Sequence, residues 1–132
     1  MNQRALFDLS KALLKFHKSL LDYQKDQVEK TTGKKLNPYE MLGAALNDPE
    51  FQWIKPVSQM IVEIDLASEK EQNDPTVALE IENSPPFNPE KIQNFWRNPP
   101  EDFNEKVIAA IEHDPDISFL FSEVRLKASA LK

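Results

Sequence analysis

Residues 46–65, LNDPEFQWIKPVSQMIVEID, contain the signals that decide the fold of this chain. An aspartate such as Asp48 can cap a helix by accepting a hydrogen bond from a free N–H, and Pro49 suits the first helical position. Apolar residues then recur with the 3.6-residue period of a helix. Pro56 lies inside that pattern, where its missing N–H is expected to kink or split the helix. The stretch therefore predicts a bent helix over about 49–71, with this buried stripe: Trp53, Val57, Met60, Ile61, Ile64 and Ala67.

The same corner recurs along the chain and predicts an all-α fold. Six of the ten prolines follow Asp or Asn, at positions 38, 49, 75, 89, 99 and 115. These corners predict helices over about 3–31, 38–47, 49–71, 75–82, 89–97, 101–113 and 115–130. A strand from Val77 to Ile81 is disfavoured because it has no partner strand. Residues 72–100 hold six prolines and are expected to form a Pro-rich crossover strap. We predict one domain over residues 1–132, a helical bundle of about five to seven helices.

Within residues 38–47, the apolar pattern predicts one face that turns toward the core. Its members are Tyr39, Leu42, Ala45 and Leu46. Other apolar residues fall off the main buried faces of their helices and are expected to cover a second helix layer or an interface: Val62, Leu66, Phe119 and Leu126.

Charge and composition argue against several functional classes. The net charge is −6, but residues 1–36 carry eight basic against four acidic residues, whereas residues 37–132 carry eight against eighteen. The acidic bulk would repel a phosphate backbone, so we expect no nucleic-acid binding. The basic first helix either steers toward an acidic partner or forms a solvated face. No apolar run is long enough for a membrane span, and the lack of cysteine fits a reducing compartment, so we expect a cytoplasmic protein.

A polar seam runs along the first helix. His17 falls on the apolar face of residues 10–24, SKALLKFHKSLLDYQ, and Ser10 and Gln24 lie seven residues to either side on nearly the same line. Ser58 and Asp65 lie at the edge of the stripe of the helix over 49–71. These five residues are a candidate buried polar site. We expect His17 to be neutral and mostly buried, bridging two helices; an acid–base pair with Asp65 is the alternative.

The residue types argue against a metal or cofactor site. The chain has two histidines, His17 and His113, and neither has a glutamate three residues before it, as helical di-iron sites require. There is no cysteine and no glycine-rich phosphate loop. Phe95 and Trp96 are adjacent, so on a helix they point about 100° apart. One of them could be exposed beside the strap, which makes them a candidate partner surface, although core packing is the other interpretation.

Two segments resemble a group of short bacterial proteins known only as hypothetical proteins. The segments are FHKSLLDYQKDQVEKTTG and DPEFQWIKPVSQMIVEID, and the resemblance covers roughly residues 9–67 and, more weakly, 103–126. Val28 stands where the group carries an aromatic residue. The resemblance implies a bacterial source and supplies no activity. These residues lie on the group's pattern: His17, Lys18, Asp48, Pro49, Phe51, Trp53, Pro56 and Ser58.

Two functions from different classes remain at this point. The first is a non-enzymatic interaction or structural protein that binds a protein partner or forms a homo-oligomer. The second is a small-molecule-binding protein or enzyme with a pocket around His17, lined by Ser10, Gln24 and Asp65. Whether the chain is an enzyme stays open, with the non-enzymatic interpretation preferred.

Overall fold

The computed structural model describes residues 3–71 and 88–131, and every regular element in these two ranges is helical. The all-α prediction is confirmed. The predicted helix over 75–82, the part of the predicted strap before residue 88 and the side chain of Ala67 lie outside what the structure describes. The elements are α1 (Gln3–Thr32), α2 (Pro38–Asn47), the 3-10 helix η1 (Pro49–Ile54), α3 (Lys55–Glu71), α5 (Pro89–Arg97), α6 (Glu101–His113) and α7 (Asp116–Ser129).

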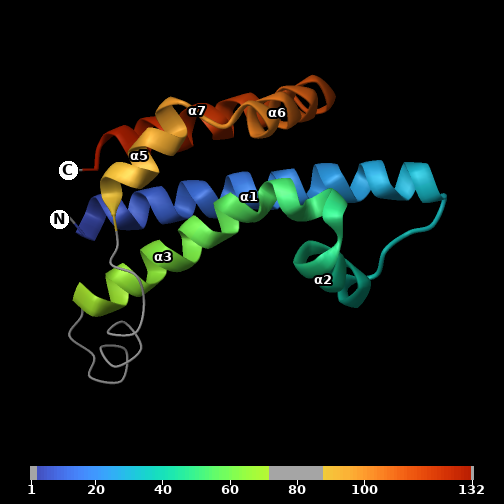
Figure 1. Ribbon diagram of the computed structural model, residues 1–132, viewed down its shortest axis with the longest axis horizontal. Helices are drawn as coiled ribbons and strands as arrows, with labels where there is room; N and C mark the ends of the chain where they lie inside the picture. The colour runs from blue at the N-terminus through green and yellow to red at the C-terminus, as the bar shows by residue number, and fades with distance from the viewer. Residues whose placement is uncertain (1–2, 72–87, 132) are drawn as a thin grey trace.

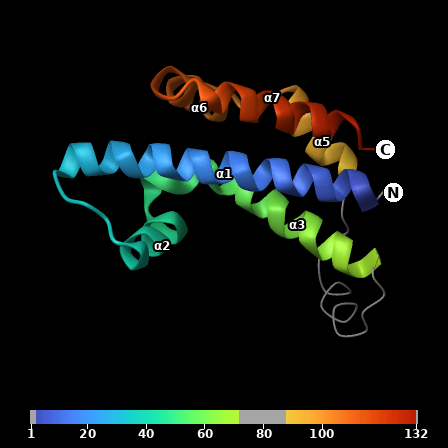
Figure 2. The ribbon, with the colours of Figure 1, turned by 180° about the vertical axis from the view of Figure 1, so that it is seen from behind.

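The long helix α1 is the centre of the bundle. It packs against α3 on one side and against α7 on the other, while α5 and α6 lie beside α7 (Figure 1). Seen from behind, α2 again lies below the end of α1 and α3 below its beginning (Figure 2). No helix in the described part of the chain is long and apolar enough to cross a membrane.

Side-chain caps explain why the helices begin where the sequence predicts. Asn37 Oδ1 accepts from the N–H of Glu40 across 2.8 Å, and the Glu40 carboxylate accepts from the N–H of Asn37, which completes a capping box. Asp48, Asn88 and Asp114 also accept from helix N–H groups. Asn98 does not cap α6, because Pro99 and Pro100 delay that helix to Glu101. At the end of α1, Gly33 has φ +72°, a conformation that favours glycine.

Pro56 splits the predicted helix as expected. The chain forms η1 up to Ile54 and then starts α3 at Lys55, without an intervening loop. Pro56 thus lies in the first turn of α3, where a missing N–H removes no intrahelical bond. Met60 remains buried, and the half-buried Trp53 packs against the core from the other side of the corner.

An aromatic cluster fills the layer between α1 and the C-terminal helices. The ring of Phe16 stacks on Phe121 with centroids 5.6 Å apart and meets the edge of Trp96 at 5.8 Å. Trp96 is 1 % exposed and Phe95 is half-buried. The candidate partner surface is therefore wrong for Trp96, which follows the core-packing interpretation, and Phe95 is only partly exposed. Burying an indole removes a large apolar area from water, and the surrounding rings add edge contacts.

The predicted inward face of α2 is also wrong. Tyr39, Leu42 and Leu46 are exposed, Ala45 is half-buried, and Met41 and Ala44 pack against the core. The apolar residues of α2 occupy two opposite faces, since Met41 and Ala44 lie about half a turn away from the three exposed residues. The sequence of α2 alone does not determine which face is buried. The corner at Asp48 and Pro49 determines it, because it places α2 beside η1.

Candidate functional site

The polar seam of α1 does not form one site. Ser10 Oγ donates to Asp65 Oδ1 of α3 over 3.4 Å, and both side chains remain accessible to solvent. This distance is at the long end for a hydroxyl donor. Among the described residues, no hydrogen bond or ion pair joins Asp65 to His17. The acid–base pair considered from the sequence therefore has no counterpart in the geometry.

Gln24 forms the firmest link of the seam. Its side chain is 8 % exposed, and it is the one buried polar residue in the part of the chain that the structure describes. Trp53 Nε1 of η1 donates to Gln24 Oε1 across 3.0 Å, an ordinary hydrogen-bond length. The Trp53 ring also packs 6.0 Å from that of Phe103, between ring centroids. Gln24 therefore ties η1 to α1, and its amide oxygen is used structurally.

His17 is half-buried, and burial lowers the pKa of its imidazole below the usual value of 6.5, as predicted. The predicted bridge is wrong: His17 has no hydrogen bond to any residue within 3–71 or 88–131. The reason lies in α1 itself. Its buried face is centred on Leu13, Phe16 and Leu20, and Leu14 is 51 % exposed, so His17 lies at the edge of that face.

Ser58 also makes a local contact. Its hydroxyl donates to the carbonyl oxygen of Lys55 across 2.9 Å, within the first turn of α3. Two cavities of the described structure are lined by other residues altogether. The five residues of the predicted polar site are thus used separately, in two helix-to-helix links, one local turn and one edge position.

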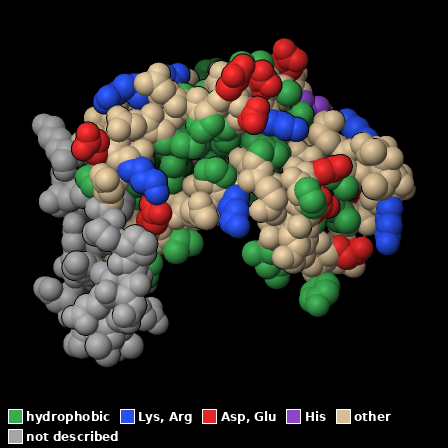
Figure 3. All heavy atoms as spheres, viewed as in Figure 1, with side chains coloured by type: hydrophobic (Ala, Val, Ile, Leu, Met, Phe, Trp, Pro, Cys, Tyr) green, Lys and Arg blue, Asp and Glu red, His purple; other side chains and the backbone are tan. Residues whose placement is uncertain are grey.

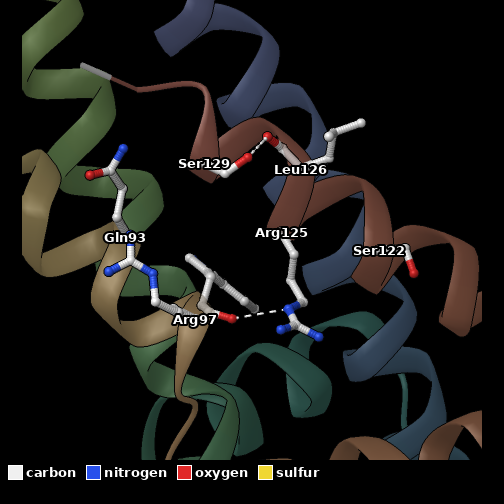
Figure 4. Close-up of a pocket in the computed structure, with 7 residues that line it drawn as sticks. Gln93, Arg97, Ser122, Arg125, Leu126 and Ser129 are labelled. Carbon is white, nitrogen blue, oxygen red and sulfur yellow. Dashed lines mark hydrogen bonds between the residues drawn. The ribbon is translucent and has the colours of Figure 1, made fainter.

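The first cavity, of about 420 Å³, lies between α5 and α7 (Figure 4). Arg97 comes from the last turn of α5, and Arg125 from the C-terminal half of α7. Arg125 Nε donates to the carbonyl oxygen of Trp96 across 3.0 Å, and its guanidinium lies 5.6 Å from the centre of the Phe121 ring. The cavity is therefore basic. Its lining residues are Gln93, Trp96, Arg97, Ser122, Arg125, Leu126 and Ser129.

The second cavity, also of about 420 Å³, lies where α1 meets the end of α6. His113 Nε2 is 3.3 Å from Asp26 Oδ2, and the His113 ring lies edge-on to Tyr23 at 5.5 Å. Lys30 Nζ approaches the same Asp26 oxygen at 3.9 Å. Asp26 already has two basic neighbours, which makes this cluster a link between α1 and α6. In the described part of the chain no group of His, Asp or Glu side chains could hold a metal ion.

The outer face of α2 is the third feature. We call Tyr39, Leu42 and Leu46 the α2 stripe; their exposed fractions are 85 %, 60 % and 65 %. They are spaced i, i+3 and i+7, so they lie on one side of the helix. Figure 3 shows apolar side chains protruding over α2, on the lower right of the molecule. Such an exposed apolar stripe on a well-capped helix is typical of an interaction surface.

Searches of protein-family models, of curated proteins and of solved structures gave no match to this chain. The three features above therefore rest on the geometry of this molecule alone.

Sequence reasoning missed the basic cavity. Arg97 and Arg125 are 28 positions apart and lie in the acidic part of the chain, so no local motif joins them. The sequence does contain a weak indication of a basic site. Both residues are arginines in a segment of 96 residues, 37–132, that has only eight basic residues. Only the packing of α5 against α7 brings the two together.

Proposed function

We propose that this chain is a non-enzymatic interaction protein that binds an acidic amphipathic helix of a protein partner through the α2 stripe. The single observation that carries this proposal is the exposure of three large apolar side chains on one side of a short helix. Water contact with that much adjoining apolar surface is unfavourable, and a partner that covers the stripe recovers the free energy.

The stripe is preorganised for binding. The capping box of Asn37 and Glu40 fixes the start of α2, and Pro38 holds its first turn. On the opposite side, Met41 and Ala44 anchor the helix to the core. This chain therefore has no helix to fold before a partner binds, which lowers the entropic cost of association.

The spacing of the stripe favours a helix as the partner element. Residues at i, i+3 and i+7 form the seam along which a second amphipathic helix lies. The stripe belongs to a helix of 10 residues, about 15 Å long at 1.5 Å per residue. That length is too short for the roughly 800 Å² per partner of a stable complex, so we expect a weak, transient contact with a partner segment and not a stable dimer of this chain.

Charge near the stripe favours an acidic partner. Residues 1–36 carry a net charge of +4, and the exposed Lys34 and Lys35 directly precede α2. Lys34 Nζ lies 3.7 Å from the Glu40 carboxylate, whereas no carboxylate of the described residues pairs with Lys35. Exposed lysines of this kind raise the rate of encounter with an acidic surface. We also propose a cytoplasmic location, with which the lack of cysteine is consistent.

The alternative of a small-molecule or enzyme pocket around His17 has less support. Ser10, His17, Gln24 and Asp65 line neither cavity, and the polar atoms of three of them bond within the protein.

Site-specific photocrosslinking in the native cell tests the proposal. A benzophenone amino acid at Leu42 is expected to link to one protein, through an acidic amphipathic segment identified by mass spectrometry. The matched control places the same group at Ile108, an exposed apolar residue of α6. A synthetic peptide of the linked segment should then bind the wild-type protein and lose binding to Leu42→Ser. Equal crosslinking from both positions, no crosslinking from Leu42, or crosslinking to a second copy would overturn the proposal.

A further inference from the structure

The cavity between α5 and α7 has the size of a small-molecule site. Its volume of about 420 Å³ falls in the usual range of ligand pockets. Helix α5 contributes Gln93, Trp96 and Arg97, and the remaining lining residues come from α7 (Figure 4). This site is separate from the α2 stripe, and its function does not depend on the interaction proposed above.

The charge of the cavity is opposite to that of the chain around it. Residues 37–132 carry eighteen acidic residues, yet none of the described lining residues is acidic. No carboxylate of the described residues comes within ion-pair distance of the Arg97 or Arg125 guanidinium. Two arginines without a counter-ion in one cavity favour a ligand that brings a negative charge.

Arg125 is held in place before any ligand arrives. Its Nε donates to the Trp96 carbonyl oxygen at the end of α5, and its guanidinium lies over Phe121. Arg125 therefore gains both a hydrogen bond and a cation–π contact that fix the side chain. The structure gives its two terminal amino groups no acceptor among the described residues. A planar fork of this kind suits the paired oxygens of a carboxylate or a phosphate.

The remaining wall has an apolar part, formed by Trp96 and Leu126. Leu126 is 67 % exposed, and Trp96 is buried. Of the three polar residues in this wall, Gln93 donates to the Leu131 carbonyl and Ser129 to the Leu126 carbonyl, and Ser122 is exposed. An apolar body next to the charged group would cover Leu126, which a simple inorganic ion cannot do.

We propose that this cavity binds a small organic anion, in which a carboxylate or phosphate group that binds Arg125, and that Arg97 attracts from the opposite wall, is joined to an apolar chain that lies on Leu126 (Figure 4). A fatty acid and an alkyl phosphate share this chemistry, and the test separates the two.

Isothermal titration calorimetry of the whole protein tests the site with four probes: hexanoate, hexyl phosphate, inorganic phosphate and hexanol. The variants are Arg97→Gln and Leu126→Asp, both at exposed positions where the fold should tolerate the change. The control is Lys106→Gln, which removes the same charge from the exposed surface of α6. A second readout is the indole N–H spectrum, because the chain has two tryptophans and Trp96 lines the cavity.

We expect hexanoate or hexyl phosphate to bind, with a shift of the Trp96 indole signal, and the tighter of the two identifies the anionic group. Affinity should fall about threefold to fivefold in Arg97→Gln, since the change removes one of the two positive charges of the cavity. Leu126→Asp should weaken it further by repulsion, and Lys106→Gln should leave it nearly unchanged. Three results would overturn the proposal: no binding of either amphiphile, equal binding of hexanol, or equal weakening by Lys106→Gln. Inorganic phosphate that binds as tightly as hexyl phosphate would refute the role of the apolar wall.

Discussion

The hydrogen bond between Trp53 and Gln24 gives the most quantitative test of how α1 holds η1. Trp53→Phe keeps an aromatic ring beside Phe103 but removes the donor, so that Gln24 Oε1, on a side chain 8 % exposed, is left without its partner. An unpaired buried acceptor costs about 1–3 kcal/mol. Gln24→Leu leaves Trp53 Nε1 unpaired instead, and because Trp53 is half-buried, water can replace part of the lost bond. We therefore expect the second variant to lose less, about 0.5–1.5 kcal/mol.

The double variant distinguishes a real bond from a loss of packing. Removing both partners leaves no unpaired group, so Gln24→Leu with Trp53→Phe should cost less than the sum of the single changes, by about 1 kcal/mol. Urea unfolding followed by far-ultraviolet circular dichroism resolves this, since about 1 kcal/mol moves the midpoint by roughly 0.3–1 M. Strict additivity of the two single changes would refute the reasoning, because it would mean that the bond contributes nothing beyond packing.

Four further changes test local features of the fold. The wild-type protein should lose stability on acidification, and His17→Leu should remove that loss. Burial lowers the pKa of His17 in the folded protein, so the unfolded chain binds the proton more readily as the pH falls below about 6.5. The loss of stability levels off below the pKa of the folded protein. Urea melts of both proteins at about pH 7.5 and about pH 5.5 check this, and an unchanged pH dependence would contradict it. Gly33→Ala should destabilise the protein by about 1 kcal/mol because Gly33 has φ +72°. Gly43→Ala, in mid-helix with open space around it, should stabilise the protein by about 0.5–1 kcal/mol. In thermal melts the first variant should therefore have a lower Tm than the wild type and the second a higher one. Asn37→Ala should cost about 1 kcal/mol and speed amide hydrogen exchange in the first turn of α2, and unchanged exchange there would argue against the capping box.

The helix boundaries could be predicted because their causes are local. Asn37, Asp48 and Asn88 each cap a helix within three residues of themselves, and Asp114 accepts from the N–H of Asp116 at the start of α7, so the sequence contains both the donor and the acceptor. The split at Pro56 is equally local. Asn98 shows the limit of this logic, because the two prolines that follow it move the helix start beyond its reach.

The orientation of each helix could not be predicted in the same way, because it depends on contacts between distant elements. Helix α2 has apolar residues on two faces, and its docking beside η1 selects Met41 and Ala44 over the α2 stripe. For Phe95 and Trp96, too, the sequence does not determine which of the two side chains is buried. Trp96 is buried because it packs against the rings of Phe16, Phe103 and Phe121. The basic cavity depends on such a contact as well, since it needs both α5 and α7.

The polar seam of α1 shows that a small error in the predicted direction of the buried face decides whether a polar residue is taken for a functional one. Counting Leu14 and Leu21 as buried widens the apolar face until His17 lies near its middle. In the structure Leu14 is 51 % exposed, and the buried face narrows to Leu13, Phe16 and Leu20, with His17 about 60° from Leu20 on the helix wheel. At that angle the imidazole is desolvated enough to lower its pKa but is not enclosed by partners. Gln24 lies about 40° from Leu20 on the same wheel, only about 20° from His17, and it is the one that finds a donor, Trp53 Nε1. The neighbouring element thus separates the two residues: η1 lies against Gln24, which joins α1 to η1, whereas His17 has no such partner, and its replacement should change the acid stability of the protein and leave its helix contacts intact.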